Sequence, residues 1–408
     1  MNTLDIIDKK RQGFELSYDE LSYVFNGYLN RDVYDYQMSS LLMAICINGM
    51  TDSEIFDLTD IFINSGEVLD FSFIDGVKVD KHSTGGIGDK TTLALVPIVA
   101  SLGIPVIKMS GRALGYTGGT IDKLESIPGF NVNLTDEEIA DSIDKVGAVI
   151  TGQTANLVPL DKMVYALRDV TATVSSIPLI AVSIMSKKIA AGADKIVIDI
   201  KVGSGAFIKN LSDAEKLSSI MVKIGEKYNR EVRYIISDMS EPLGVYVGNS
   251  LEVIDAIKVL KNEGDFNLKK TVVHLASIMV SMAKGISEED AINLVNAVLE
   301  DGRAWQKFQQ IVENQGGKLL EMKVSDNQQV ISSEKSGYVR KIDALGIGRL
   351  SMSLGAGRMS KDDIIDYSVG VKLNVKSGDF VNVGDALCTL YLKGDTNYNF
   401  DYNIFDIR

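Results

Sequence analysis

Residues 77–111 read VKVDKHSTGGIGDKTTLALVPIVASLGIPVIKMSG, and this stretch decides the fold. Its ends, VKVDKH and IPVIKMSG, are short β-branched segments typical of buried strands. Between them lie a glycine-rich loop, KHSTGGIGDKTT (81–92), and the apolar segment TTLALVPIVASLG, which predicts a helix. Strand, loop, helix and strand in this order predict a parallel α/β unit, in which ligands bind at the carboxyl ends of the strands.

The glycine-rich loop indicates a site for a phosphate-sized anion. Its glycines allow main-chain N–H groups to approach a ligand closely. Lys81 supplies positive charge, Ser83 and Thr92 supply hydroxyl groups, and the helix that follows adds the positive end of its dipole. The spacing matches neither the P-loop nor the dinucleotide fingerprint. An ordinary glycine-rich turn is the alternative interpretation.

Helices are predicted on both sides of this unit. The capping boxes Ser17-x-x-Glu20 and Thr51-x-x-Glu54 predict a helical region over residues 1–65. LDKMVYALRDVTATV and PLIAVSIMSKKIAAG, within 160–192, predict helices that pack with the N-terminal ones. Further helices are expected to about residue 315.

Further strands complete the predicted sheet and a small terminal domain. GAVIT, ADKIVIDIKVGSG and VRYIISDM are predicted as strands, and short alternating strands follow residue 330. GDFVNVGDALCTLYL resembles the strand pair of lipoyl or biotinyl carrier domains but lacks their modifiable lysine, so no organic cofactor is expected. The predicted domains are a helical domain (1–66 with 160–192), an α/β phosphate-binding domain (67–159 and 193–330) and a C-terminal α+β domain (331–408).

Composition limits the classes of function. The 408 residues carry a net charge of −13, which argues against a nucleic-acid partner. No segment of 18 uncharged apolar residues predicts a membrane span, and no signal peptide is expected from the charged first residues. The two cysteines show no metal-binding spacing, so we expect a cytoplasmic protein, with Cys46 buried in an apolar helix.

Four motifs taken together resemble the thymidine and pyrimidine-nucleoside phosphorylases across essentially the whole chain. In order, they are KHSTGGIGDKTT, KMSGRALGYTGGTIDKLESIPGF, YALRDVTATVSSIPLIAVSIMSKKIA and DIKVGSGAF. The resemblance implies a helical domain, a large α/β domain with a mixed central sheet and a small C-terminal α+β domain. The anthranilate phosphoribosyltransferases are more distant relatives.

The resemblance also implies reversible phosphorolysis of uridine, thymidine and deoxyuridine to the free base and (deoxy)ribose 1-phosphate, by a homodimer built through the helical domain. Three alternatives stay open: a strict thymidine phosphorylase, a phosphoribosyltransferase of related fold, and a non-catalytic binding protein. Small-molecule substrates, and neither nucleic acid nor membrane, are the expected partners.

The family's site residues map onto this chain motif by motif. His82, Arg168 and Lys187 are the implied catalytic residues, with His82 hydrogen-bonded to the pyrimidine O2. The implied substrate-binding residues are Lys81, Ser83, Gly85, Thr92, Lys108, Met109, Ser110, Thr120, Arg168, Ser183 and Lys187. Arg168, Ser183 and Lys187 are expected to bind the base. Ser183 and Lys187 stand four residues apart and so share one helix face.

A potassium ion is implied as well, held by backbone oxygens and one carboxylate. The matching positions are Gly88, Lys90, Leu243, Tyr246 and Asp255. Lys90 replaces a smaller residue common in relatives, and Asp255 stands where glutamate is usual. Lys108 is typical of broad-specificity members, since strict thymidine enzymes tend to carry an apolar residue there. Lys108 is therefore expected to donate to a ribose 2′-hydroxyl.

Overall fold

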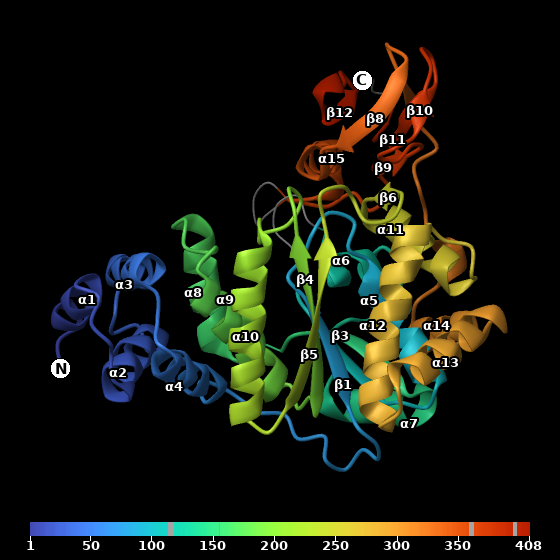
Figure 1. Ribbon diagram of the computed structural model, residues 1–408. Coiled ribbons are helices and arrows are strands. Elements are labelled where there is room, and N and C mark those ends of the chain that lie inside the picture. The colour runs from blue at the N-terminus through green and yellow to red at the C-terminus, as the bar shows by residue number, and fades with distance from the viewer. Residues whose placement is uncertain (113–117, 155, 359–362, 395–397) are drawn as a thin grey trace. The chain divides into compact units, whose positions relative to one another are not determined.

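The computed structural model describes residues 1–112, 118–154, 156–358, 363–394 and 398–408 (Figure 1). Within it the chain forms two compact units. The first unit comprises residues 1–82, 153–198 and 211–234, and the second comprises 83–152, 199–210 and 235–408. The predicted domain boundaries stay a prediction. The strands β1, β4 and β5 each have residues in both units. No helix in the described ranges is long and apolar enough to cross a membrane.

The first unit is mainly helical. Helix α4 packs against α9 and α2, and α8 contacts both α2 and α3, so the predicted packing of the inserted helices on the N-terminal ones is confirmed. Both predicted capping boxes form, at the starts of α2 and α4. The helices are α1 (Thr3–Arg11), α2 (Tyr18–Leu29), α3 (Asp35–Asn48), α4 (Asp52–Ile63), α8 (Pro159–Val170), α9 (Ile177–Ala190) and α10 (Leu211–Lys227).

A buried ion pair joins the first helices. The Lys10 ammonium donates to both carboxylate oxygens of Glu54, at 2.6 and 2.8 Å, and the two side chains are 4% and 0% exposed. Glu54 also accepts from the backbone N–H groups of Leu16 and Thr51. The carboxylate that caps α4 therefore also fixes α1. The prediction that Cys46 is buried is wrong: Leu42 and Ile45 face the core, and Cys46 lies at the edge of that face, half-buried.

Three strands form one sheet in the order β1–β4–β5. They are β1 (Val79–Ser83), β4 (Lys195–Val202) and β5 (Glu231–Asp238), and each matches a predicted strand. Past the end of β1, the backbone N–H of Thr84 still donates to the backbone oxygen of Asp199. This contact fixes the start of the glycine-rich loop against β4.

The α/β part of the second unit surrounds one buried helix. Helix α5 (Thr91–Ser101) is buried from Thr91 to Ala100 and contacts α11, α12, α13 and α14. A helix covered on all sides must be apolar all round, which explains its continuous hydrophobic sequence. Strands β2 (Val106–Ser110) and β3 (Ala148–Gly152) pair in parallel. The other helices are α6 (Thr120–Glu125), α7 (Asp136–Val146), α11 (Asn249–Leu260), α12 (Phe266–Lys284), α13 (Glu288–Glu300) and α14 (Arg303–Asn314).

The C-terminal part of this unit contains two small sheets, in the orders β6–β9–β11–β7 and β10–β8–β12. Helix α15 (Ala344–Ser351), with two glycines, was not predicted, and it packs against β9. The strands are β6 (Tyr246–Val247), β7 (Gln328–Ser332), β8 (Gly337–Ile342), β9 (Gly370–Leu373), β10 (Phe380–Val381), β11 (Ala386–Tyr391) and β12 (Phe405–Ile407), and short helical turns cover Leu319–Glu321, Met352–Ala356 and Tyr402–Ile404.

Candidate active site

The glycine-rich loop is organised by a carboxylate inside it. Ser83 Oγ donates to Asp89 Oδ2 at 2.5 Å and accepts from the Gly85 N–H at 3.1 Å. The other carboxylate oxygen of Asp89 accepts from both the backbone N–H and the hydroxyl of Thr91, at the start of α5. Gly85 has a φ of 86°, which glycine adopts without strain. Asp89 therefore holds the Ser83 hydroxyl beside the helix N-terminus, a role that the sequence did not reveal.

The residues before this loop lie in β1. Lys81 is 1% exposed and His82 is half-buried. Side chains alternate along a strand, so Lys81 and Ser83 point to one face and His82 points to the other. The lysine and the serine thus share the face expected of anion donors, whereas the histidine lies on the opposite face. Thr92, in the first turn of α5, is buried.

The second glycine-rich loop starts where β2 ends. Lys108, Met109 and Ser110 are 4%, 2% and 8% exposed, and β3 pairs with this end of β2. Lys108 Nζ donates to the backbone oxygen of Met109 at 3.3 Å. Residues 113–117 of the motif lie outside the described ranges, and Thr120 is the first residue of α6.

A buried lysine connects the two glycine-rich loops. Lys123, on α6, donates to the backbone oxygen of Asp89 at 2.6 Å and pairs with Glu252 on α11 at 2.8 Å. Both side chains are 1% exposed. Helix α6, which Thr120 begins, is thereby fixed to the loop that contains Ser83. The motif TIDKLES includes Lys123, but its spacing does not reveal this contact.

The predicted base-binding residues lie on α8 and α9 of the first unit. Lys187 Nζ donates to Ser183 Oγ at 3.1 Å, so the predicted neighbours on one helix face do meet. The same ammonium donates to Asp161 Oδ2 at 2.6 Å. The other oxygen of Asp161 is buried and has no hydrogen-bond partner among the residues that the structure describes. Asp161 therefore orients Lys187, which sequence reasoning did not anticipate.

Arg168 is more constrained than its predicted role requires. Its side chain is buried, and three of its five N–H groups are bound to backbone oxygens. The three acceptors are the carbonyls of Thr173, Val174 and Leu179, at 3.3, 2.8 and 3.1 Å. Arg168 thus fixes the connection from α8 to α9, and its other two N–H groups have no acceptor in the described part of the chain. Burial lowers the pKa of its guanidinium from the usual value.

The aromatic ring of Tyr165 lies beside both cations of the α8–α9 cluster. The Arg168 Cζ and the Lys187 Nζ each lie 5.9 Å from the centre of the Tyr165 ring. Burial, followed by the charge of Asp169, raises the pKa of Tyr165 above its ordinary value. The hydroxyl therefore stays protonated at neutral pH. Two cations beside an aromatic ring form a setting suited to a planar ligand that develops negative charge.

The five residues assigned to potassium come together in the second unit, but an ammonium lies among their oxygens. Lys90 Nζ donates to the backbone oxygens of Leu243 and Tyr246, at 2.8 and 2.6 Å, and to Asp255 Oδ2 at 2.9 Å. A potassium ion that used these oxygens would compete with that cation. The residues present therefore do not fit potassium. Elsewhere in the described ranges, no group of three or more His, Cys, Asp and Glu residues could hold a metal.

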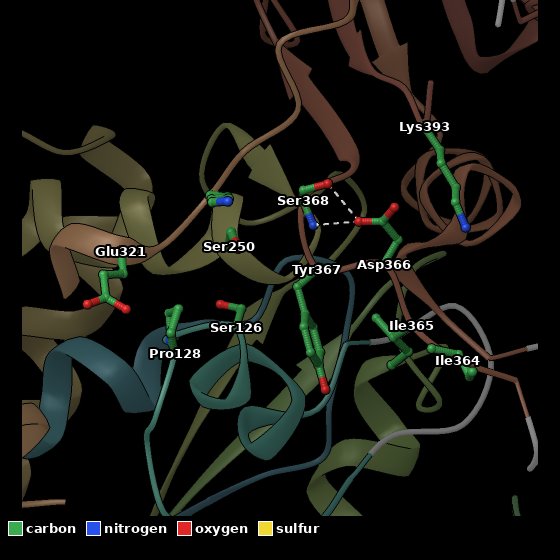
Figure 2. Close-up of a pocket in the computed structure, with 11 residues that line it drawn as sticks. Ser126, Pro128, Ser250, Glu321, Ile364, Ile365, Asp366, Tyr367, Ser368 and Lys393 are labelled. Atoms are coloured by element: carbon green, nitrogen blue, oxygen red, sulfur yellow. Dashed lines mark hydrogen bonds between the residues drawn. The ribbon is translucent and has the colours of Figure 1, made fainter. Parts of the chain in front are cut away.

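The second unit also has a cavity of about 490 Å³, shown in Figure 2. Ser126, Ser250, Tyr367 and Lys393 are among its lining residues, and no predicted substrate-binding residue lines it. The candidate site residues lie elsewhere. The predicted phosphate-binding residues lie on β1 and at the two glycine-rich loops, and the predicted base-binding residues lie on α8 and α9.

Comparison with known proteins identifies the family. Residues 4–66 match the helical bundle domain of a glycosyl transferase family, residues 75–305 match its a/b domain, and residues 338–399 match the C-terminal domain of pyrimidine nucleoside phosphorylase. The pyrimidine-nucleoside phosphorylase of Geobacillus stearothermophilus is 50% identical over 398 residues, covering 96% of this chain and 92% of that protein. The chain belongs to the pyrimidine-nucleoside phosphorylase family. The resemblance found in the motifs is confirmed.

Other relatives agree with this assignment. The pyrimidine-nucleoside phosphorylase of Staphylococcus haemolyticus (strain JCSC1435) is 50% identical over 401 residues, with 96% of this chain and 92% of that protein covered. The crystal structure of an anthranilate phosphoribosyltransferase from Thermus thermophilus superposes with a TM-score of 0.61 at 18% identity, covering 76% of this chain and 99% of that one. That likeness concerns the fold alone. The predicted fold class, with its helical, α/β and small C-terminal parts, is confirmed.

Proposed function

We propose that the protein catalyses the reversible phosphorolysis of pyrimidine nucleosides. The observation that carries this proposal is the cluster on α8 and α9, where Lys187 and Arg168 flank the Tyr165 ring. Family membership supplies the reaction. A phosphate oxygen forms a bond to C1′ while the C1′–N1 bond breaks, its electron pair leaves with the base, and a proton then reaches the base.

The residues divide this chemistry between charge and positioning. Lys187, held by Asp161 and Ser183, places a positive charge where the leaving base becomes anionic. Arg168 adds a second positive charge and two unused N–H groups. His82 is the proposed donor to the pyrimidine O2, since an imidazole can transfer a proton near neutral pH.

The two glycine-rich loops are the proposed phosphate site. Lys81, Ser83, Gly85, Thr92, Ser110 and Thr120 are the proposed contacts, together with Met109. In support, Lys123 links the loop to α6; on phosphate binding, the single proton of the Ser83 hydroxyl turns from Asp89 to the anion. Helix N-termini and backbone amides favour an anion even in a chain of net negative charge.

Broad specificity is part of the proposal. Lys108 is buried beside the phosphate serine Ser110, and its ammonium is suited to pair with a ribose 2′-hydroxyl. Uridine, deoxyuridine and thymidine are then all substrates. Cytidine is a poor one, because its 4-amino group turns N–H donors towards Lys187.

The assembly and location proposed are a homodimer, joined through the helical domain, in the cytoplasm. Support for the dimer comes from large apolar side chains exposed within the first 48 residues. They include Leu4, Phe14, Tyr18, Tyr23, Tyr34, Tyr36, Met43 and Ile47. Support for a reducing compartment comes from the two cysteines, which are both free.

The proposal is tested by measuring release of uracil and thymine from their nucleosides with and without inorganic phosphate. We expect release only when phosphate is present, and formation of nucleoside from base and pentose 1-phosphate in the reverse direction. Release that ignores phosphate would indicate a hydrolase. Consumption of base only with a pyrophosphorylated pentose would indicate a phosphoribosyltransferase.

A further inference from the structure

The side chain of Lys90 ends in a closed cage of oxygen atoms. Lys90 follows Asp89 in the glycine-rich loop and directly precedes α5, and its side chain is 0% exposed. An ammonium has three N–H donors and no acceptor. Here each donor has its own acceptor, at 2.6–2.9 Å: two backbone oxygens and one carboxylate oxygen. The hydrogen-bonding capacity of the ammonium is therefore fully used.

One oxygen of the carboxylate in the cage is equally constrained. Asp255 is 0% exposed, and its Oδ2 also accepts from the backbone N–H groups of Val245 and Tyr246, at 3.0 and 3.3 Å. A buried charge is tolerated when it is paired and hydrogen-bonded, and Asp255 Oδ2 satisfies both conditions, whereas its Oδ1 is buried with no hydrogen-bond partner among the described residues. Lys90 and Asp255 together make the interior of the cage neutral.

Two glycines allow the walls of the cage to approach the ammonium. A Cβ added to Gly244 would lie 2.3 Å from Asp255 Oδ2 and 2.9 Å from Lys90 Nζ. A Cβ added to Gly88 would lie 2.7 Å from the Leu243 oxygen and 3.3 Å from Lys90 Nζ. Both glycines have a φ of 74°, which other residues rarely adopt. A side chain larger than hydrogen at either position would clash first with these cage oxygens.

Carbonyl oxygens with one carboxylate are the donors that hard cations prefer. We propose that the Lys90 ammonium takes the place of a monovalent metal ion in this cage, so that the protein fixes its glycine-rich loop without bound potassium. A second cation among the same oxygens would give a buried cage an unbalanced positive charge. The tether from loop to cage is covalent, because Lys90 belongs to the loop itself.

The cage reaches the proposed phosphate site through the neighbouring residue. Asp89 holds Ser83 and Thr91, while Lys90 holds Leu243, Tyr246 and Asp255. Residues 89 and 90 thus fix the loop through two separate sets of partners. A built-in cation maintains this arrangement whatever the salt in solution.

A second lysine offers a matched control. Lys376 Nζ donates to the backbone oxygens of Pro242 and Gly244, at 3.3 and 2.6 Å, and so holds the same segment as Lys90. It does not bond to Asp255 and leaves the three acceptors of Lys90 untouched. Replacing it weakens the segment without vacating the cage.

The test is thermal unfolding of the full chain in potassium chloride and in tetramethylammonium chloride at equal ionic strength. We expect the wild-type melting temperature to be the same in both salts. Lys90→Ser vacates the cage, so in tetramethylammonium chloride this variant should have a lower melting temperature than wild type. Its melting temperature should rise with potassium concentration until it saturates, as mass action requires for an ion bound only by the folded state. Lys376→Met should melt lower than wild type by the same amount in both salts.

Three results would overturn the proposal. A wild-type melting temperature that rises with potassium would show that the cage still binds the ion, and this measurement needs no variant. A Lys90→Ser protein that gains no more from potassium than Lys376→Met does, or that folds in neither salt, would show that the cage is not a cation site. Because the readout is unfolding, failure here leaves phosphorolysis untouched, and failure of phosphorolysis leaves this result intact.

Discussion

Replacing Lys187 with methionine tests whether its positive charge stabilises the leaving base. The same change also affects the stability of the fold. The Lys187 ammonium lies 2.6 Å from Asp161 Oδ2 and 3.1 Å from Ser183 Oγ, on α9. Methionine keeps much of the side-chain volume and removes the charge and the donors. Two distinct losses follow from the structure, one in the rate and one in the free energy of unfolding.

The kinetic loss comes from the transition state. A charged donor that meets negative charge only as the C1′–N1 bond breaks is worth on the order of 10²–10³ in kcat. The stability loss comes from Asp161, whose side chain is only 5% exposed and would lose the partner that compensates its burial. Orphaning one member of a buried ion pair costs about 3 kcal/mol in the free energy of unfolding.

A double variant distinguishes the two losses. Adding Asp161→Asn to Lys187→Met removes the orphaned charge, so most of the unfolding free energy should return while kcat stays low. Lys188→Met is the matched control, since Lys188 is the next residue of the same helix but pairs with Asp80 at 2.5 Å. We expect Lys188→Met to lower stability and to leave kcat near the wild-type value below its melting temperature.

The assays are steady-state phosphorolysis of uridine at saturating phosphate and denaturant unfolding of all four proteins. A Lys187→Met enzyme with unchanged kcat at saturating nucleoside would refute the role of this residue. Recovery of kcat in the double variant would equally refute it, because the charge that stabilises the base would then be dispensable.

Other changes test other parts of the structure. Lys108→Met should reduce kcat/KM for uridine about tenfold more than for thymidine, the effect of one hydrogen bond worth about 1–1.5 kcal/mol, whereas equal losses would assign Lys108 to phosphate. Glu54→Gln should lower the free energy of unfolding by about 3 kcal/mol, because it leaves the Lys10 ammonium buried without a counter-charge. An unchanged free energy of unfolding, measured with denaturant, would contradict this. Burial raises the pKa of Cys388 to about 12, so at pH 8 a thiol reagent should modify Cys46 in the native protein and should modify Cys388 only after unfolding. Equal rates of modification at the two cysteines would contradict the assigned burial of Cys388.

Local sequence signals predicted the parts of the fold that depend on local physics. Ser17 with Glu20, and Thr51 with Glu54, satisfy the first N–H groups of their helices without help from distant residues, so these helices could be placed from spacing alone. The strands β2 and β3 were equally evident from β-branched runs that end in glycine. Helix α15 was missed because its two glycines weaken the local preference, and packing against β9 stabilises it instead.

The candidate site was predictable in its residues and not in their contacts. Motif resemblance singled out Lys187 and Arg168, but Asp161 is 26 positions from Lys187 and has no motif of its own. The contacts of the Lys90 side chain were even less predictable. Its backbone was expected to face a metal ion, yet its side chain reaches acceptors 153–165 positions away, which only the folded chain brings near.

The most direct test of the central claim follows the oxygen that becomes bonded to C1′. Uridine is incubated with the protein and with phosphate labelled with ¹⁸O at every oxygen, in unlabelled water, and the pentose product is analysed by mass spectrometry and ³¹P NMR. We predict ribose 1-phosphate that carries ¹⁸O at the oxygen bridging C1 and phosphorus, with one equivalent of uracil. Free ribose, or a bridging oxygen without label, would contradict attack by phosphate at C1′.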